Sequence, residues 1–282
     1  MTPEPCQSAD YGDRQTEAAR RVLIDLGQVL ASFADCLVVV GGWVPDLLLP
    51  EAEEPHIGSI DIDLALDAEK LGDGRYAEML KLLFDTKRYQ QGEKAFQLIV
   101  HVDLKDGQDP VRVEVEFLAP KEVKLASNHP KLIEGFRVLQ IDGCDVAFAA
   151  PVEHEISGLN VRGADNTVSL HVTSLADFLV MKALAIGRRD KPKDSYDFCY
   201  CLQHATEGPA KLAEIWKQRT PTRLLQISLA VLRTKFSSVN SFGPQQVVEF
   251  HNAPLPDEQA IQARRAYELV QEFLRHFPSP DA

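Results

Sequence analysis

Hydrophobic and polar residues alternate along residues 58–66, GSIDIDLAL. Successive side chains of a strand point to opposite faces, so the two isoleucines and Leu64 share one face while Asp61 and Asp63 share the other. Two neighbouring carboxylates repel each other and are costly to remove from water unless a cation or a hydrogen-bond donor compensates them. The pattern therefore predicts a strand with a buried apolar face and a charged face that needs a partner.

The first half of the chain mixes helical and strand-like patterns. Helical spacing of apolar residues predicts helices, and the ranges that show it are 14–33, 43–49 and 75–85. Runs rich in β-branched residues between turn residues predict strands at 36–40, 60–66, 96–104 and 111–120, with irregular strands over 137–172. This order predicts an α/β (α+β) core with a mixed sheet.

From Thr173 onward the pattern is helical throughout. Helices are expected at 173–189, 193–205, 209–219, 222–236 and 256–277. We therefore expect two domains, a core over 1–172 and an all-helical C-terminal domain over 173–282.

Composition is that of a soluble globular protein of 282 residues. No apolar run approaches the length of about 18 residues that a membrane span needs, and the polar, acidic N-terminus is unlike a secretory signal. The five cysteines form neither a CxxC pair nor an even set. We therefore expect reduced thiols, a cytoplasmic location and no membrane partner.

The formal net charge of −12 and the pI near 5.1 argue against tight, general DNA binding, because broad nucleic-acid surfaces are usually basic. A transient contact with an RNA substrate through a local patch remains compatible with this charge. The densest basic run, RRDKPK at 188–193, is the candidate for a nucleotide or RNA contact.

Acidic residues on two predicted strands suggest metal chemistry. Asp61 and Asp63 on one strand face suit two Mg²⁺ ions at a phosphate. The strand at 111–120 adds Glu114 and Glu116 on one face, and either is a candidate for a third metal ligand or a base. We favour Glu116, since an acid followed by two apolar residues also describes Asp63, but both glutamates stay open.

Two glycines, Gly41 and Gly42, end the strand at 36–40. Glycine lets a backbone turn sharply and approach a ligand closely, and a following helix presents N–H groups to phosphate oxygens. In the second half, Lys182 and Arg189 are seven residues apart and therefore share one helical face, where they could meet a triphosphate.

These features occur together in one known family. They are Gly41-Gly42, Ser59-x-Asp61-x-Asp63, a later strand acid, Lys182, Arg189 and Lys193-Asp194-x-x-Asp197. The set, which spans roughly residues 35–200, resembles the AbiEii family, the toxins of type IV toxin–antitoxin systems, within the polymerase-beta-like nucleotidyltransferase superfamily.

The resemblance implies transfer of a nucleoside monophosphate from an NTP to an acceptor, with release of pyrophosphate. Asp61, Asp63 and Glu116 would be catalytic and would bind two Mg²⁺ ions, with Mn²⁺ as an alternative. The nucleotide-binding residues that it implies are Gly41, Gly42, Ser59, Lys182, Arg189, Lys193 and Asp194. It also implies tRNA or another cellular target as acceptor and a cognate antitoxin as protein partner.

Two departures from the family pattern keep other functions open. The third acid is Glu116, where the family more commonly has Asp, and Asp46 lies close after the glycines. A non-catalytic descendant that binds a nucleotide or a partner is one alternative. Within the enzyme class, a protein or a small molecule such as an aminoglycoside is an alternative acceptor.

Each motif also has a purely structural interpretation. Asp61 and Asp63 could lie on a solvated strand face. Lys193 and Asp197 could be an ordinary surface ion pair, and Asp194 an N-cap. The three histidines that we considered show no metal-ligand spacing with the cysteines and are assigned no chemistry; they are His56, His101 and His154.

Overall fold

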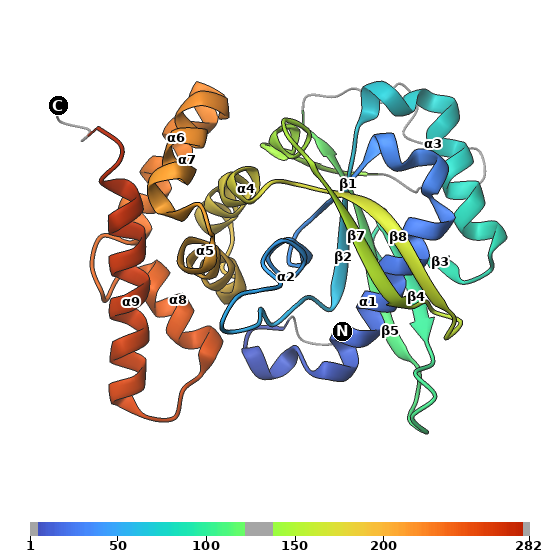
Figure 1. The fold of residues 1–282 in the computed structure, drawn as a ribbon, viewed down its shortest axis with the longest axis horizontal. Coiled ribbons are helices and arrows are strands. Elements are labelled where there is room, and N and C mark those ends of the chain that lie inside the picture. Colours follow the sequence, from blue (N-terminus) through green and yellow to red (C-terminus); the bar gives the residue numbers. More distant parts are fainter. Residues whose placement is uncertain (1–4, 122–137, 279–282) are drawn as a thin grey trace. The chain divides into compact units, whose positions relative to one another are not determined.

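A computed structural model of the chain describes residues 5–121 and 138–278, which fall into two compact units (Figure 1). The sheet unit comprises Gly12–Leu47 and Gly58–Ser174. The helical unit comprises Leu48–Ile57 and the described residues of Met1–Tyr11 and Leu175–Ala282. A division by chain position at 172 places Leu48–Ile57 in the core, whereas contacts such as the hydrogen bond from the Tyr200 hydroxyl to the Glu54 carbonyl oxygen (2.7 Å) tie this segment to the helices.

The sheet unit is built on a mixed sheet, as the sequence predicts. Its strands are β1 (Leu37–Val40), β2 (Asp61–Leu66), β3 (Tyr89–Gln91), β4 (Gln97–Val102), β5 (Val111–Pro120), β6 (Leu139–Ile141), β7 (Val152–Leu159) and β8 (Asp165–Val172). They follow the order β3-β4-β5-β2-β1-β8-β7, with β6 beside β5. Strands β2 and β5 are parallel, whereas β1 and β2 are antiparallel, so the end of β1 lies beside the beginning of β2.

The remaining elements of the sheet unit are helical. They are α1 (Asp13–Val29), α2 (Trp43–Leu48), α3 (Ala68–Asp85) and the 3₁₀ turns Ala31–Cys36 and Cys144–Phe148. Helix α3 begins earlier than predicted because the Asp67 side chain accepts hydrogen bonds from the backbone N–H groups of Glu69 and Lys70.

Helix α1 lies along one face of the sheet (Figure 1). Leu64 of β2 faces this helix, and the parallel register places Phe117 of β5 beside it. Ile62 and Val115 form the next such pair, and all four side chains are buried. The apolar face predicted for β2 is therefore the core face, which leaves the opposite face for the acids.

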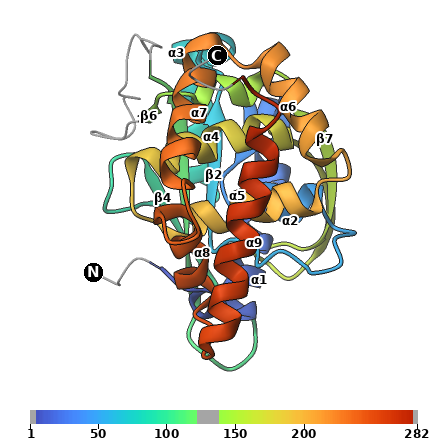
Figure 2. The ribbon, with the colours of Figure 1, turned by 90° about the vertical axis from the view of Figure 1, so that its left-hand side faces the viewer.

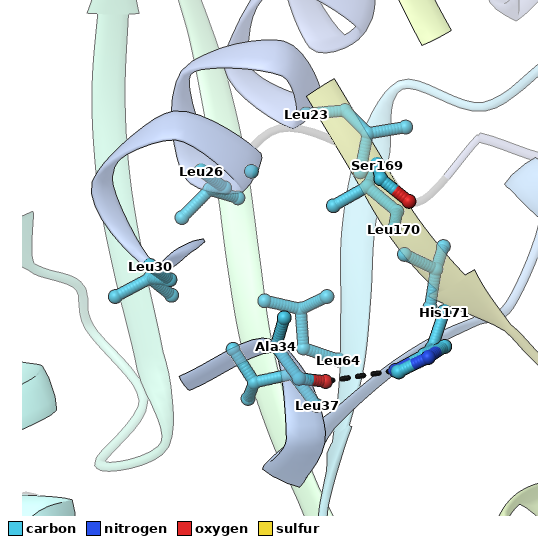
Figure 3. Close-up of a pocket in the computed structure, with 11 residues that line it drawn as sticks. Leu23, Leu26, Leu30, Ala34, Leu37, Leu64, Ser169, Leu170 and His171 are labelled. Atoms are coloured by element: carbon cyan, nitrogen blue, oxygen red, sulfur yellow. Dashed lines mark hydrogen bonds between the residues drawn. The ribbon is translucent and has the colours of Figure 1, made fainter. Parts of the chain in front are cut away.

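A small apolar gap of about 20 Å³ remains between α1 and the sheet (Figure 3). Leucines line most of it, and a hydrogen bond between the His171 ring nitrogen Nδ1 and the Ala34 carbonyl oxygen (2.9 Å) lies at its edge. A space of this size has room for about one water molecule and its apolar walls offer few hydrogen-bond partners. The gap is a packing feature of the core and has no room for a nucleotide.

The helical unit consists of helices and one short 3₁₀ turn, Ser8–Asp10. The helices are α4 (Leu175–Arg188), α5 (Pro192–His204), α6 (Gly208–Arg219), α7 (Thr222–Lys235), α8 (Phe242–His251) and α9 (Pro256–Leu274). Figure 2 shows α9 alongside α5, where Phe198 meets Phe273 with ring centroids 6.2 Å apart. Trp216 of α6 packs on the same Phe273 at 4.9 Å, which gives the unit an aromatic core.

Strand β3 and helix α8 were not predicted. Helix α8 starts with Phe242-Gly243-Pro244, which suggests a loop when read as sequence. Proline is nevertheless tolerated in a first helical turn, and Gly243 is required because a Cβ there would lie 2.4 Å from the Phe236 ring.

A buried ion pair joins α1 to the region of β3. The Arg88 guanidinium donates to both carboxylate oxygens of Asp25 (3.0 and 3.1 Å), and the Tyr89 hydroxyl donates to Asp25 Oδ2 (2.8 Å). Burial and the Asp25 carboxylate raise the pKa of Tyr89 well above its usual value, so the hydroxyl keeps the proton that it donates.

We predict that Asp25→Ala lowers the free energy of unfolding by about 3–5 kcal/mol, because it leaves the partly buried Arg88 without this partner. Tyr89→Phe removes one hydrogen bond to a charged group and should cost about 2 kcal/mol. Urea denaturation followed by circular dichroism measures both. Losses below about 0.5 kcal/mol for both variants would contradict the structural role.

Candidate active site

The two predicted strand acids lie in register with the two glutamates of β5. Asp61 pairs with Glu114 and Asp63 with Glu116 across the parallel β2–β5 pair. Neighbouring strands are about 4.8 Å apart, and paired residues share a sheet face. Four half-buried carboxylates therefore gather on the face opposite α1.

Local contacts fix the beginning of β2. The Ser59 hydroxyl donates to Asp61 Oδ1 at 2.6 Å, and the indole N–H of Trp43 donates to the Asp61 carbonyl oxygen at 2.9 Å. Ser59 and Trp43 are themselves buried. The structure thus brings the predicted Ser59 to Asp61, where it compensates part of the negative charge.

Gly41 lies against the second aspartate. Val40, the last residue of β1, pairs with Asp63, and the next residue, Gly41, turns with a φ of +71°. A Cβ on Gly41 would lie 2.0 Å from Asp63 Oδ2, a distance that no side chain can accept. Glycine at this position therefore leaves the space that the carboxylate occupies. Helix α2 spans only six residues, so the turn, rather than a helix dipole, carries the argument for a phosphate site here.

Polar side chains of β4 and its preceding loop compensate the glutamates. The buried Gln97 amide donates to Glu114 Oε2 (2.5 Å) and to Glu116 Oε1 (3.2 Å). Lys94 adds an ion pair to Glu116 at 2.8 Å, and Arg112 pairs with Glu114. The sequence gave no motif for Gln97 or Lys94; only the pairing of Gln97 with Glu116 across β4 and β5 reveals them.

The donors on this face suit a divalent cation. Carboxylate oxygens are the ligands that Mg²⁺ prefers, and the side chain missing from Gly41 leaves room at Asp63. Within residues 5–121 and 138–278, no three acidic, histidine or cysteine side chains converge into a ready-made metal site. This fits Mg²⁺, which is usually held by one or two carboxylates together with substrate phosphates.

The remaining predicted site residues belong to the helical unit and converge on one carboxylate. Lys182 of α4 donates to Asp194 Oδ1 at 2.7 Å. Arg189, just after α4, donates through Nε to Asp194 Oδ2 (2.7 Å) and through Nη2 to Oδ1 (3.0 Å). Asp194 is buried, whereas the Arg189 side chain is 53% exposed. Asp194 therefore orients two cations, of which Arg189 is accessible to a ligand.

A second buried carboxylate, Asp197, holds the other predicted lysine. Lys193 donates to Asp197 Oδ1 at 2.8 Å, and Lys182 lies 2.7 Å from Asp197 Oδ2. Both partners of the Lys193–Asp197 pair are buried, so the interpretation as a surface ion pair is wrong. Asp194 is not an N-cap either, because α5 begins at Pro192 and its N-cap is Lys191.

These contacts set the charge states of the cluster. Burial alone would lower the pKa of Lys182, but Asp194 and Asp197 outweigh it and raise that pKa above its usual value. Burial would raise the pKa of Asp194, yet Lys182 and Arg189 lower it to about 2. The pKa of Asp197 is lowered in the same way, by Lys182 and Lys193. At neutral pH three cations thus face two carboxylates, and the cluster keeps an excess of positive charge.

The fold and the paired carboxylates, together with a family-model match over residues 58–281, define a nucleotidyltransferase. The matching model is that of the nucleotidyl transferase AbiEii toxins of type IV toxin–antitoxin systems, and the chain belongs to this family. Membership implies an NTP as substrate and an antitoxin as partner, and nucleotidyltransferases generally use divalent metal ions. Gly41, Gly42 and His56 precede the matched residues.

Two solved structures are similar in fold. An antigenic nucleotidyltransferase-like protein from Paracoccidioides brasiliensis is 20% identical, with a TM-score of 0.44, over 79% of this chain and 89% of that chain. MenT4, a nucleotidyltransferase toxin from Mycobacterium tuberculosis H37Rv, is 14% identical, with a TM-score of 0.48, over 98% of this chain and 91% of that chain. No curated protein matches the chain.

Two expectations about environment can be compared with the structure. The five cysteines are free thiols, as predicted. In the described part of the chain, no helix is both long and apolar enough to cross a membrane.

We predict that Gly41→Ala abolishes nucleotidyl transfer, because the new methyl group displaces the Asp63 carboxylate. The matched control is Gly163→Ala, since Gly163 has a similar φ of +76° but open space where its Cβ would lie. Both variants carry the backbone strain of a left-handed alanine, about 1–2 kcal/mol, and only the first should lose at least about 99% of the activity at a temperature where both are folded. Equal activities of the two variants would contradict the role of Gly41.

The pH dependence of stability gives a second test. Burial and the nearby Lys193 lower the pKa of His56 to about 4, against about 6.5 in an unfolded chain. The unfolded chain therefore binds a proton that the folded protein resists, and stability is lost as pH falls from about 6.5 to 4. Between pH 7 and pH 4.5 this loss should be about 2 kcal/mol.

His56→Gln removes the titrating group and should lose about 2 kcal/mol less than the wild type over the same interval. Urea denaturation at the two pH values measures the difference. Equal pH slopes for the two proteins would contradict a buried, neutral His56.

Proposed function

We propose that this protein is a Mg²⁺-dependent toxin that transfers a nucleoside monophosphate from an NTP to tRNA and releases pyrophosphate. The observation that carries the proposal is the pairing of Asp61 with Glu114 and of Asp63 with Glu116, beside a glycine that leaves space at Asp63. Carboxylates in this arrangement suit two-metal catalysis at phosphorus.

Asp61 and Asp63 would hold the metal ions, which when bound stabilise negative charge on the phosphate oxygens. Ser59 keeps the Asp61 carboxylate in place, and Gly41 and Gly42 allow the backbone to approach the triphosphate. Glu116 is the favoured third acid, as a further metal ligand or as the base that accepts the proton of the acceptor hydroxyl. The new bond joins the acceptor oxygen to the α-phosphorus, and the bond to the leaving pyrophosphate breaks.

The helical unit would contribute positive charge to nucleotide phosphates. Lys182, Lys193 and Arg189 exceed the charge of their two carboxylate partners, and the half-exposed Arg189 is suited to bidentate phosphate contacts. Asp194 would act by orienting Arg189 and Lys182.

tRNA is favoured over a small molecule because the chain belongs to a toxin family. Exposed arginines at 188 and 189 offer a local basic patch on an otherwise acidic protein. Such a patch supports a brief, salt-sensitive encounter rather than tight binding.

To test the proposal, the protein is incubated with Mg²⁺, each α-labelled NTP in turn, and total tRNA or no acceptor. We expect label in tRNA with one preferred NTP, and its loss in the Asp61→Asn/Asp63→Asn double variant. Glu116→Gln should lower the rate by about 10²–10⁴-fold, the range for a lost general base, whereas Glu114→Gln, which is held by Arg112 and Gln97, should retain most activity.

Label on the protein itself, or only on an added aminoglycoside, would replace tRNA as the acceptor. No label under any condition would contradict the proposed reaction. A larger loss for Glu114→Gln than for Glu116→Gln would assign the third acid to Glu114 instead.

A further inference from the structure

His56 lies in the segment Leu48–Ile57, which connects α2 to the beginning of β2 and belongs to the helical unit. Its side chain is fully buried. The imidazole stacks on Tyr196 (ring centroids 5.4 Å apart, planes at 21°) and meets the edge of Tyr200 (4.8 Å, 65°). Both tyrosines are on α5, so the ring is held tightly against the helix that carries Lys193, Asp194 and Asp197.

The imidazole nitrogen Nε2 lies 3.0 Å from Asp197 Oδ1. An ionised carboxylate can only accept hydrogen bonds, so Nε2 must carry the proton of this bond. The same Oδ1 accepts from Lys193 at 2.8 Å, while Oδ2 faces Lys182 at 2.7 Å. Asp197 is therefore held between two lysines and one histidine, with no exposure to water.

A neutral donor at this point has a specific electrostatic effect. A third cation beside Asp197 would add positive charge to a buried cluster that already has an excess of it, at a large desolvation cost. A neutral imidazole satisfies the carboxylate without that cost. With a neutral donor fixing Oδ1, Asp197 is anchored and does not need to draw both ammonium groups fully onto itself.

We propose that His56 is a positioning residue that fixes Asp197 and thereby sets the positions of Lys182 and Lys193 for binding nucleotide phosphates. The inference rests on the proposed function, because it assigns these lysines to the nucleotide. Without the imidazole donor, the two ammonium groups compensate Asp197 more completely and less of their charge is available to a phosphate.

Two variants separate positioning from packing. His56→Phe keeps an aromatic ring against Tyr196 and Tyr200 but removes the donor. His56→Gln restores a neutral amide donor near the position of Nε2. We expect His56→Phe to raise KM for the preferred NTP about tenfold while changing kcat less than about threefold, since a hydrogen bond to a charged group is lost from the binding site. His56→Gln should return KM to within about threefold of the wild-type value.

A direct binding measurement keeps this inference separable from the proposed reaction. Isothermal titration with an α,β-methylene NTP and Mg²⁺ should show the same tenfold weakening in His56→Phe and the same recovery in His56→Gln. If the wild type binds the analogue but labels no acceptor, the proposed reaction fails while the titration still tests His56.

Unchanged Kd and KM in His56→Phe at a temperature where the variant is folded would overturn the proposal. Equal weakening in His56→Phe and His56→Gln would overturn it as well, because the donor would then not matter. A wild-type protein that binds no nucleotide would overturn both this inference and the proposed function. In the wild-type ring, a proton on Nδ1 instead of Nε2, observed by ¹⁵N NMR, would exclude the hydrogen bond to Asp197 and also overturn it.

Discussion

The repulsion among like charges on one sheet face is the constraint on which this structure depends. Asp61, Asp63 and the two glutamates paired with them share a half-buried face, and such a group is stable only where donors and cations compensate it. The protein supplies part of that compensation through the Ser59 hydroxyl, the Gln97 amide and the Lys94 ammonium group. A substrate with bound cations would supply the rest, so the electrostatic cost of the empty site becomes affinity for a metal–nucleotide complex.

The helical unit presents the opposite charge balance with the same economy of contacts. Asp194 and Asp197 are buried and ionised because each is held by two cations, and the cations in turn stay charged because the carboxylates are there. Removing one member would leave a buried charge uncompensated, so the network is all-or-none in character. The segment that carries His56 enters this network directly, although in the chain it lies between the two motifs of the sheet unit.

Much of the fold followed from periodicity, because alternation in β2 and β5 and helical spacing after Thr173 are local signals. The register of Asp63 on Glu116 was beyond reach, since it joins residues more than fifty positions apart and depends on the packing of α1. Because that register pairs both glutamates with aspartates, it does not by itself choose between them. The docking of Leu48–Ile57 escaped prediction for a similar reason: its partners Tyr196, Asp197 and Tyr200 form one face of a distant helix, and a polar connector gives no sign of them.

The central claim, that the paired carboxylates hold metal ions at an NTP, is tested most directly by a crystal structure with Mn²⁺ and an α,β-methylene NTP. Anomalous scattering would locate the manganese independently of the protein density. We predict peaks about 2 Å from carboxylate oxygens of Asp61 and Asp63, with the phosphates of the analogue as further ligands. Nucleotide bound with manganese away from these two residues would contradict the account.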